Sequence, residues 1–189
     1  AGDKAAAYSS LVEARAQYQT AINRLRDVEA KGELQRRFVD IAVKWAAISL
    51  LAPSEEIIAA LETARQYAQH LGDIDRHAKS TAYLGAITLW SGQFPKGVSL
   101  LAEVISQSHN IHDEEPIGIA YAFTAWEGMW TSKFEQVIDY CEKSIPILQR
   151  SGNRLIDGLI VALLAYAYGW TGNFKKSSKH FVEVLNLAQ

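Results

Sequence analysis

The feature that most constrains this chain is a pattern that repeats every 40 residues. Three segments of the form Trp-x-x-x-Phe begin at Trp90, Trp130 and Trp170. A second set of positions holds alanine with the same spacing, at Ala42, Ala82, Ala122 and Ala162. Self-similarity at a period of this length is typical of arrays in which each unit buries its apolar face against its neighbours. We therefore expect a stack of similar units rather than one compact core.

Each period contains two stretches with apolar residues at helical spacing, separated by turn signals. In the second period, Ala82 and Leu89 belong to the first stretch, and Leu101 and Val104 belong to the second. Apolar residues three or four apart predict amphipathic helices. We expect four antiparallel helix pairs, over 33–72, 73–112, 113–152 and 153–189. A further helix over about residues 3–30 would make 1–32 the remnant of an incomplete repeat.

Side chains that can cap helices stand at the predicted helix starts. Asp73, Asp113 and Asn153 are of the types that accept a hydrogen bond from the first free backbone N–H groups of a helix. Ser132 followed by Glu135 has the spacing of a capping box. These residues predict where the helices of the array begin.

The ends of the sequence show no distinctly polar helix. The last predicted helix runs to Gln189 without a turn signal, and the chain opens on Ala-Gly-Asp. Because repeat arrays need polar terminal units to stay soluble, we expect the sequence to be a fragment of a larger protein. Homodimerisation through the apolar ends is the alternative.

Composition excludes several classes of function. The chain has 189 residues, with 19 basic and 21 acidic side chains and one cysteine. This balance does not provide the clustered positive charge that nucleic acids require, so no nucleic-acid partner is expected. The longest apolar run, 159–170, is shorter than a bilayer span, so no membrane partner is expected. A single cysteine cannot form an internal disulfide, and a cytoplasmic protein is predicted.

The repeat resembles the tetratricopeptide repeat, whose pattern is W-x2-L-G-x2-Y followed by A-x3-F. The matching positions of the second period are Thr81, Leu84, Gly85, Thr88, Gly97 and Leu101. The period departs from the usual 34 residues, and Trp45 stands at the small-residue position of the first repeat. The resemblance implies an all-α, right-handed superhelix of helix pairs, an α-solenoid without catalytic activity.

Two short segments extend this resemblance to the helical-repeat regions of large bacterial signalling proteins. They are Ala-Pro-Ser-Glu-Glu at 52–56 and Gly-Trp-Thr-Gly at 169–172. In those proteins the repeats follow an ATPase module and accompany a nucleotide-cyclase or protein-kinase domain. The repeat region of the maltose-regulon activator is a more distant relative. The resemblance implies a regulatory region of a larger signalling protein.

No motif in the chain indicates catalysis or a bound cofactor. Neither of the glycine-rich nucleotide-binding motifs is present, and H-E-x-x-H and G-x-S-x-G are also absent. Asp73, Asp75 and His77 do not share one helix face, and nothing in 109–115 fixes a set of metal ligands. Cys141 occupies an inward position, which predicts a buried thiol. We therefore expect no catalytic residue, no metal and no cofactor.

By the resemblance, the first helix of each pair lines a concave groove. The predicted binding residues are Lys79, Tyr83, Ala86, Trp90, Trp126, Met129, Trp130, Tyr166 and Trp170. The same columns add Ala82 and Leu89 from the second repeat, Ile119 and Ala122 from the third, and Leu159, Ala162 and Gly169 from the fourth. This lining is poor in charge and rich in aromatic rings, so we expect an apolar ligand such as an amphipathic helix.

Two alternatives stay open at this point. Trp90, Trp130 and Trp170 either pack between successive repeats or bind a ligand, whereas Trp126 is the stronger binding candidate. The predicted function is a non-enzymatic scaffold for a protein or peptide partner, or for an adjacent domain of the parent protein. The alternative is a module that senses a small-molecule effector in the aromatic groove.

Overall fold

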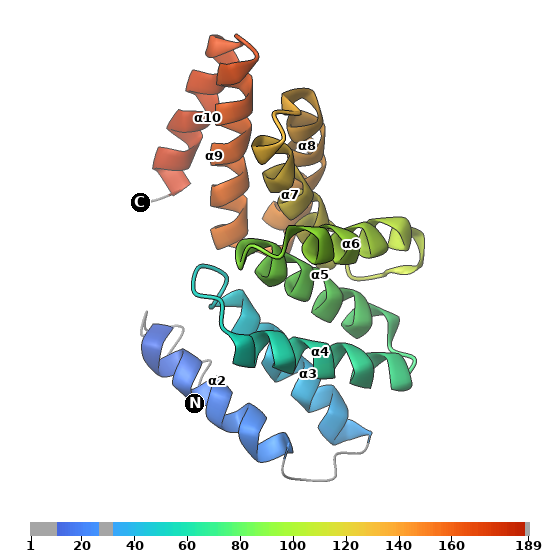
Figure 1. Ribbon diagram of the computed structural model, residues 1–189. Coiled ribbons are helices and arrows are strands. Elements are labelled where there is room, and N and C mark those ends of the chain that lie inside the picture. The colour runs from blue at the N-terminus through green and yellow to red at the C-terminus, as the bar shows by residue number, and fades with distance from the viewer. Residues whose placement is uncertain (1–10, 27–31, 188–189) are drawn as a thin grey trace. The chain divides into compact units, whose positions relative to one another are not determined.

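The computed structural model describes residues 11–26 and 32–187, and this part of the chain consists of helices joined by short turns (Figure 1). The helices are α2 (Leu11–Arg26), α3 (Glu33–Ala47), α4 (Glu55–His70), α5 (Ile74–Trp90), α6 (Phe94–Ser106), α7 (Glu115–Trp130), α8 (Phe134–Ser151), α9 (Arg154–Trp170) and α10 (Phe174–Leu187). A short 3-10 helix, Ser108–Asn110, follows α6. The predicted all-α fold of four helix pairs after one preceding helix is confirmed. The ends of the helix predicted over 3–30 lie outside the described residues.

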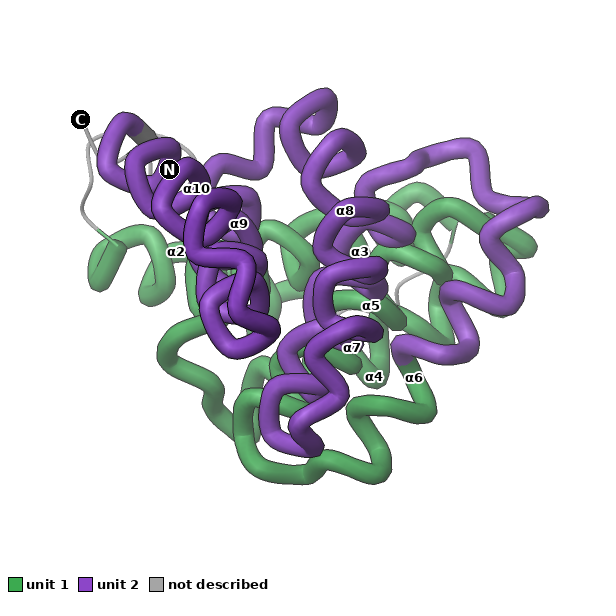
Figure 2. Tube along the Cα trace, turned by 90° about the horizontal axis from the view of Figure 1, so that it is seen from above, with its two compact units in different colours: residues 1–100 green, residues 101–189 purple. Residues whose placement is uncertain are grey.

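The helices form two compact units, Ala1–Leu100 and Leu101–Gln189, and the boundary falls within α6 (Figure 2). In the first unit, α5 packs against both α3 and α4. Every residue from Ser80 to Leu89 is buried there, because α5 is covered on several faces. In the second unit, α9 packs against α7, α8 and α10. The 40-residue period does not indicate this division.

The turn between the two helices of a pair is built in the same way in the last three repeats. After α5, the N–H of Gly92 donates to the carbonyl of Leu89, and the N–H of Gln93 donates to that of Thr88. The turns after α7 and α9 repeat this pair of bonds. The pattern is a Schellman motif, which ends a helix with one residue in the left-handed conformation. This explains why the Trp-x-x-x-Phe segments mark helix boundaries.

Ser132 is the residue in the left-handed conformation after α7, with φ of 57°, so the predicted capping box of Ser132 and Glu135 is wrong. The N-cap of α8 is Lys133, and no side chain caps this helix. Glycine holds the same position in the neighbouring repeats, at Gly92 and Gly172. The turn imposes a positive φ on Ser132, and this requirement outweighs its capping preference.

Replacing Ser132 with glycine is therefore expected to stabilise the protein by about 1 kcal/mol, since glycine adopts a positive φ without a steric penalty. Chemical denaturation followed by circular dichroism measures this change. Gly172→Ser is the reciprocal control and should destabilise by a similar amount. A Ser132→Gly variant that is no more stable than the parent would show that the turn is not strained.

The other predicted caps have different outcomes. The side chain of Asp73 accepts a hydrogen bond from the N–H of Arg76, and that of Asn153 accepts one from the N–H of Ile156, so both predictions are confirmed. Asp113 accepts a hydrogen bond from the N–H of Glu115, but α7 begins at Glu115 and its N-cap is Glu114. The N-cap predicted at Asp113 is therefore one residue too early.

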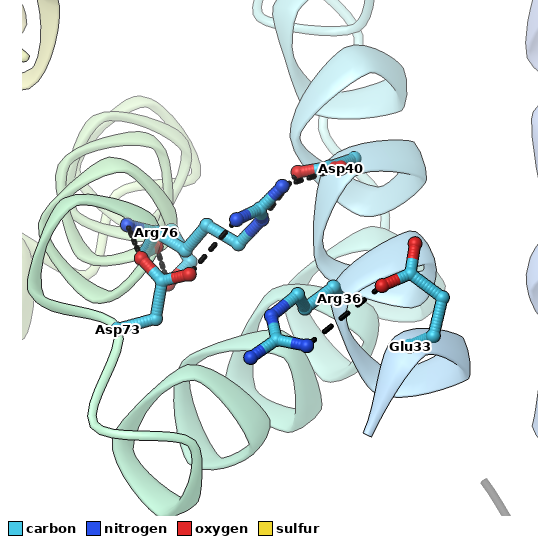
Figure 3. A network of polar contacts seen from close by, with 6 residues as sticks. Glu33, Arg36, Asp40, Asp73 and Arg76 are labelled. Carbon is cyan, nitrogen blue, oxygen red and sulfur yellow. Dashed lines mark hydrogen bonds and ion pairs between the residues drawn. The ribbon is translucent and has the colours of Figure 1, made fainter. Parts of the chain in front are cut away.

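An ion-pair network joins α3 to α5 in the first unit (Figure 3). The guanidinium of Arg76 donates to both carboxylate oxygens of Asp40, at 2.8 and 3.0 Å, and to Asp73 at 2.8 Å. Hydrogen bonds to these two carboxylates raise the pKa of Arg76. Burial alone would raise the pKa of Asp73, but its bonds to Arg76 hold that pKa below its usual value. The network therefore links the first helices of two successive repeats through charge-assisted hydrogen bonds.

Candidate functional site

An apolar groove lies between α7 and α9 in the second unit. Its volume is about 430 Å³. It is lined by Trp126, Met129 and Trp130 on α7, and by Leu159, Ala162, Leu163 and Tyr166 on α9. None of these side chains carries a charge, and their hydrogen-bonding groups are the indole nitrogens and the tyrosine hydroxyl.

Helical periodicity explains why these residues share one surface. The three α7 residues are spaced by three and then one, and the four α9 residues follow the spacing i, i+3, i+4, i+7. Each set therefore forms one stripe along its helix. Ile119, seven residues before Trp126 on the same stripe of α7, is fully buried, and the lining residue Leu163 on α9 is buried as well. The groove therefore combines exposed aromatic side chains with buried ones that join it to the core.

The aromatic side chains of the groove are open to solvent. Trp130 is 70% exposed and Tyr166 is 56% exposed. Trp126 and Met129 are half-buried. Large exposed aromatic side chains that gather in one place are typical of interaction surfaces rather than of ordinary protein surface.

The structure brings together four of the nine predicted binding residues. Trp126, Met129, Trp130 and Tyr166 line this groove, and Leu159 and Ala162 join them as expected. Leu163 was not predicted, although it lies four residues after Leu159 and three before Tyr166, a spacing that places it on the same stripe.

Four of the predicted binding residues, Lys79, Tyr83, Ala86 and Trp90, lie on α5 in the other unit. Tyr83 and Ala86 are buried in its core, so neither is part of an exposed groove. Lys79 is partly exposed, as is Trp90 at the end of the same helix. The burial of α5 on several faces removes the surface that the repeat pattern predicted there.

Trp170 contacts the preceding repeat and is still accessible. Its indole stacks on Phe134 of α8, with ring centroids 5.6 Å apart and an interplanar angle of 2°. The side chain is nevertheless largely exposed, as is that of Trp130. In the second unit the tryptophan column is therefore not enclosed between repeats, and Trp170 combines a packing contact with an open ring face.

A second hollow, of about 730 Å³, lies between α2 and α3 in the first unit. Its lining is mixed and includes Arg24, Arg37, Lys44 and Asp40, the last of which is bound by Arg76. The sequence analysis did not predict it. Its charged lining differs in kind from the apolar groove of α7 and α9.

The single cysteine of the chain, Cys141, lies in the core. Cys141 is fully buried, and burial, with a contribution from Glu142, raises the pKa of its thiol to about 12. A thiol with that pKa is protonated at neutral pH and is a poor nucleophile.

Within 11–26 and 32–187, no three His, Cys, Asp or Glu side chains gather in a way that could hold a metal ion. None of the helices described is long and apolar enough to cross a membrane.

Asp157, near the start of α9, is a buried carboxyl group. It is only 4% exposed, and its Oδ1 has no hydrogen-bond partner among the described residues. Burial raises the pKa of Asp157 above its usual value, and the negative charge of Glu183 raises it further, while a hydrogen bond with Gln149 acts in the opposite direction. Ionised Asp157 therefore destabilises the folded state.

We expect Asp157→Asn to stabilise the protein at neutral pH by about 1 kcal/mol, the scale of a buried unsatisfied polar group. Since the folded-state pKa lies above the unfolded value, protonation favours folding. The stability of the parent protein should fall as pH rises between those two pKa values. Thermal unfolding at about pH 7 and about pH 3.5 measures this effect. The gain in stability of Asp157→Asn over the parent protein should be present at neutral pH and small at acidic pH. An equal gain at both pH values would contradict the prediction that ionised Asp157 destabilises the fold.

No protein-family model matches the sequence, and no curated protein matches it. Solved structures match along almost the whole chain. BtubC (BKLC) from P. vanneervenii superimposes with a TM-score of 0.65 at 14% identity, covering 99% of this chain and 76% of that one.

Two further matches are structures of a putative kinesin light chain from Podosopora anserina with nearly identical TPR-like repeats. The first has a TM-score of 0.61 at 14% identity and covers 98% of this chain and 90% of that one. The second has a TM-score of 0.59 at 13% identity and covers 99% and 91% of the two chains. The helix pairs, their turns and these three matches agree, and the chain has a tetratricopeptide-like helical-repeat fold.

Proposed function

We propose that this chain is a non-enzymatic interaction module that binds an amphipathic helix of a protein partner in the groove between α7 and α9. The observation that carries the proposal is the continuous apolar lining of that groove, with Trp130 and Tyr166 exposed at 70% and 56%. A charged or strongly polar ligand would lose its hydration there without gaining partners.

The shape of the lining favours a helix as the ligand. Two stripes, one from each of α7 and α9, leave a hollow between them. An amphipathic helix buries its apolar face in a groove of this kind through residues at i, i+3, i+4 and i+7. Trp126 and Trp130 would act as aromatic anchors, because large rings with few rotamers contribute most to many interfaces.

The fold and the sequence resemblance support a regulatory setting. We propose that the array belongs to a larger cytoplasmic signalling protein with an ATPase module and a nucleotide-cyclase or protein-kinase domain. In that setting, the helix bound in the groove comes from a partner protein or from an adjacent domain. Binding of this helix in the groove would then favour one arrangement of the attached domains over another.

A labelled peptide tests the groove directly. The probe is a peptide of about 18 residues with leucines at i, i+3, i+4 and i+7 and a balanced mixture of Lys and Glu elsewhere. The control is a peptide of the same composition in scrambled order, which has no continuous apolar face. Fluorescence anisotropy should show saturable binding of the first peptide and at least about tenfold weaker binding of the second. Equal binding of both peptides would contradict the proposal.

The volume of the groove supports one second candidate, a small apolar effector. About 430 Å³ lies within the range of pockets that hold small organic ligands, roughly 300–1,000 Å³. A thermal-shift screen of aromatic metabolites and nucleotides separates the two functions, because a ligand of the folded state raises the melting temperature. A compound that raises it and displaces the leucine peptide would favour the effector. A screen without such a compound would favour the helix.

A further inference from the structure

The hollow between α2 and α3 in the first unit carries an excess of positive charge. Its volume is about 730 Å³, and its lining includes Arg24 on α2 and Arg37 and Lys44 on α3. The only carboxylate among the lining residues is that of Asp40, and the guanidinium of Arg76 donates to both of its oxygens (Figure 3). The lining therefore has three cations and one carboxylate that is already bound.

Two of these cations have no partner within the part of the chain that the structure describes. Arg24 and Arg37 form no ion pair or hydrogen bond there, and both residues are exposed to solvent. A guanidinium presents a planar set of N–H donors that fits the oxygens of a phosphate or a carboxylate. Because α2 packs against α3, two such groups from the two helices can bind one anionic group together.

The repeat period shows that this charge is specific to the pair formed by α2 and α3. The positions equivalent to Arg24 in the later repeats hold small or apolar side chains that are buried, namely Ala64, Val104 and Ser144. The positions equivalent to Lys44 include two buried leucines, Leu84 and Leu164. Where the later repeats place core side chains, α2 and α3 therefore place cations around a hollow.

The rest of the lining supplies apolar surface beside the cations. Tyr18 is 7% exposed, and Leu25 and Ile41 are half-buried. Sites for small ligands are clefts of roughly 300–1,000 Å³ in which apolar walls surround a few polar groups that fix the orientation of the ligand. The hollow lies within this range, so it suits a small molecule that combines an anionic group with an apolar body.

The distribution of charge along the array favours a compact ligand over an extended acidic peptide. The positions equivalent to Arg37 hold His77, Ile117 and Asp157, and those equivalent to Lys44 are uncharged. No Lys or Arg recurs at either position, so these positions do not form a row of cations along successive first helices. An acidic peptide would therefore find its cations at one place only.

We propose that the hollow between α2 and α3 binds a small organic anion, in which a phosphate or carboxylate group is attached to an aromatic or aliphatic body. The anionic group lies between Arg24 and Arg37, which donate to its oxygens from the two helices. The body lies on Leu25 and Ile41, and the charge of Lys44 adds to the attraction. This site belongs to the first unit and does not rest on the groove between α7 and α9.

Four small probes separate the two parts of the ligand. In this set 1-naphthyl phosphate and 1-naphthoate combine an anionic group with an aromatic body, whereas 1-naphthol lacks the charge and inorganic phosphate lacks the body. Isothermal titration calorimetry should show that at least one organic anion binds saturably and at least about tenfold more tightly than both 1-naphthol and inorganic phosphate. The tighter of the two organic anions identifies the anionic group. If neither organic anion binds more tightly than both controls, the proposal is wrong.

Substitutions of arginine assign the binding to the hollow. Arg24→Gln and Arg37→Gln should each weaken binding of the tighter organic anion by at least about tenfold, because each removes a charged donor. Arg26→Gln is the matched control, since Arg26 is exposed near the end of the same helix and does not line the hollow. This variant should keep the affinity within about twofold of the parent protein. The melting temperature should be nearly unchanged in all three variants, because these side chains are exposed.

Trp126→Ala tests whether the aromatic body binds elsewhere, because Trp126 lines the groove between α7 and α9. It should leave the affinity for the organic anion unchanged. A loss of affinity in Trp126→Ala that the two arginine variants do not share would overturn the proposal, and it would place the probe in the other groove.

Salt and an acidic peptide test the type of ligand. Raising the NaCl concentration from about 50 to about 500 mM should weaken binding of the organic anion, because salt screens its attraction to the arginines. A peptide of about six glutamates should bind more weakly than the organic anion, since the cations do not continue along the array. Binding that salt does not weaken would overturn the contact with Arg24 and Arg37. Tighter binding of the glutamate peptide, lost in the two arginine variants, would overturn the proposal in favour of an acidic peptide.

Discussion

Gly97→Ala is expected to lower the free energy of unfolding by about 2 kcal/mol, the typical cost of overpacking a close contact. Gly97 lies on α6, where a methyl group would come within 2.8 Å of the backbone nitrogen of Leu89 and 2.9 Å of the carbonyl oxygen of Gly85. Backbone atoms cannot move aside by changing a rotamer, so α6 would have to separate from α5. Urea denaturation followed by circular dichroism measures the loss.

Gly158→Ala is the matched control for this prediction. Gly158 lies within α9, and a methyl group added to it would meet no atom within 4 Å. Alanine should therefore stabilise the protein by about 0.5–1 kcal/mol through its higher helix propensity. If both substitutions stabilise the protein, the close approach of α5 and α6 at Gly97 is wrong.

Trp126→Ala is expected to weaken binding of the leucine peptide by about thirtyfold or more, which corresponds to the roughly 2 kcal/mol or more of an interface hot spot. The ring of Trp126 lines the groove and is half-buried, so it offers a large apolar area beside the α9 stripe. Helical content should be retained in the variant. Anisotropy titration and circular dichroism of the same samples measure both effects.

The control for Trp126 is Phe94→Ala, which removes an exposed aromatic side chain at the start of α6 in the other unit. It should leave peptide affinity within about twofold of the parent protein. A cooperative loss of stability in Trp126→Ala, without a separate change in affinity, would show that this tryptophan belongs to the core and does not anchor a partner.

The repeat period explains why the fold was predictable. The helices that precede the aromatic turns end at Trp90, Trp130 and Trp170, as the spacing indicated. The turn after α7 was less predictable, because Ser132 and Glu135 match the local pattern of a capping box while the chain requires a left-handed residue there. Comparing Ser132 with the glycines of the matched turns would have revealed this.

The candidate site was predictable only in part. Trp126, Met129, Trp130 and Tyr166 share a groove because helical spacing and the repeat period together fix their faces. Tyr83 is buried, and so are Phe123 and Leu163, the residues 40 and 80 positions later, so this repeat position faces the core. The period shows which residues are equivalent, but it does not show which of the equivalent positions are exposed.

The central claim is that the groove between α7 and α9 is an open surface that receives an apolar helix. Met129 is the only methionine in the sequence and lines that groove, so protein labelled with ¹³C in the methionine methyl group gives one NMR signal that reports on the site. Titration with the leucine peptide should shift this signal saturably, with the same dissociation constant as anisotropy, and the scrambled peptide should not shift it. Saturable peptide binding with an unchanged Met129 methyl signal would contradict the account.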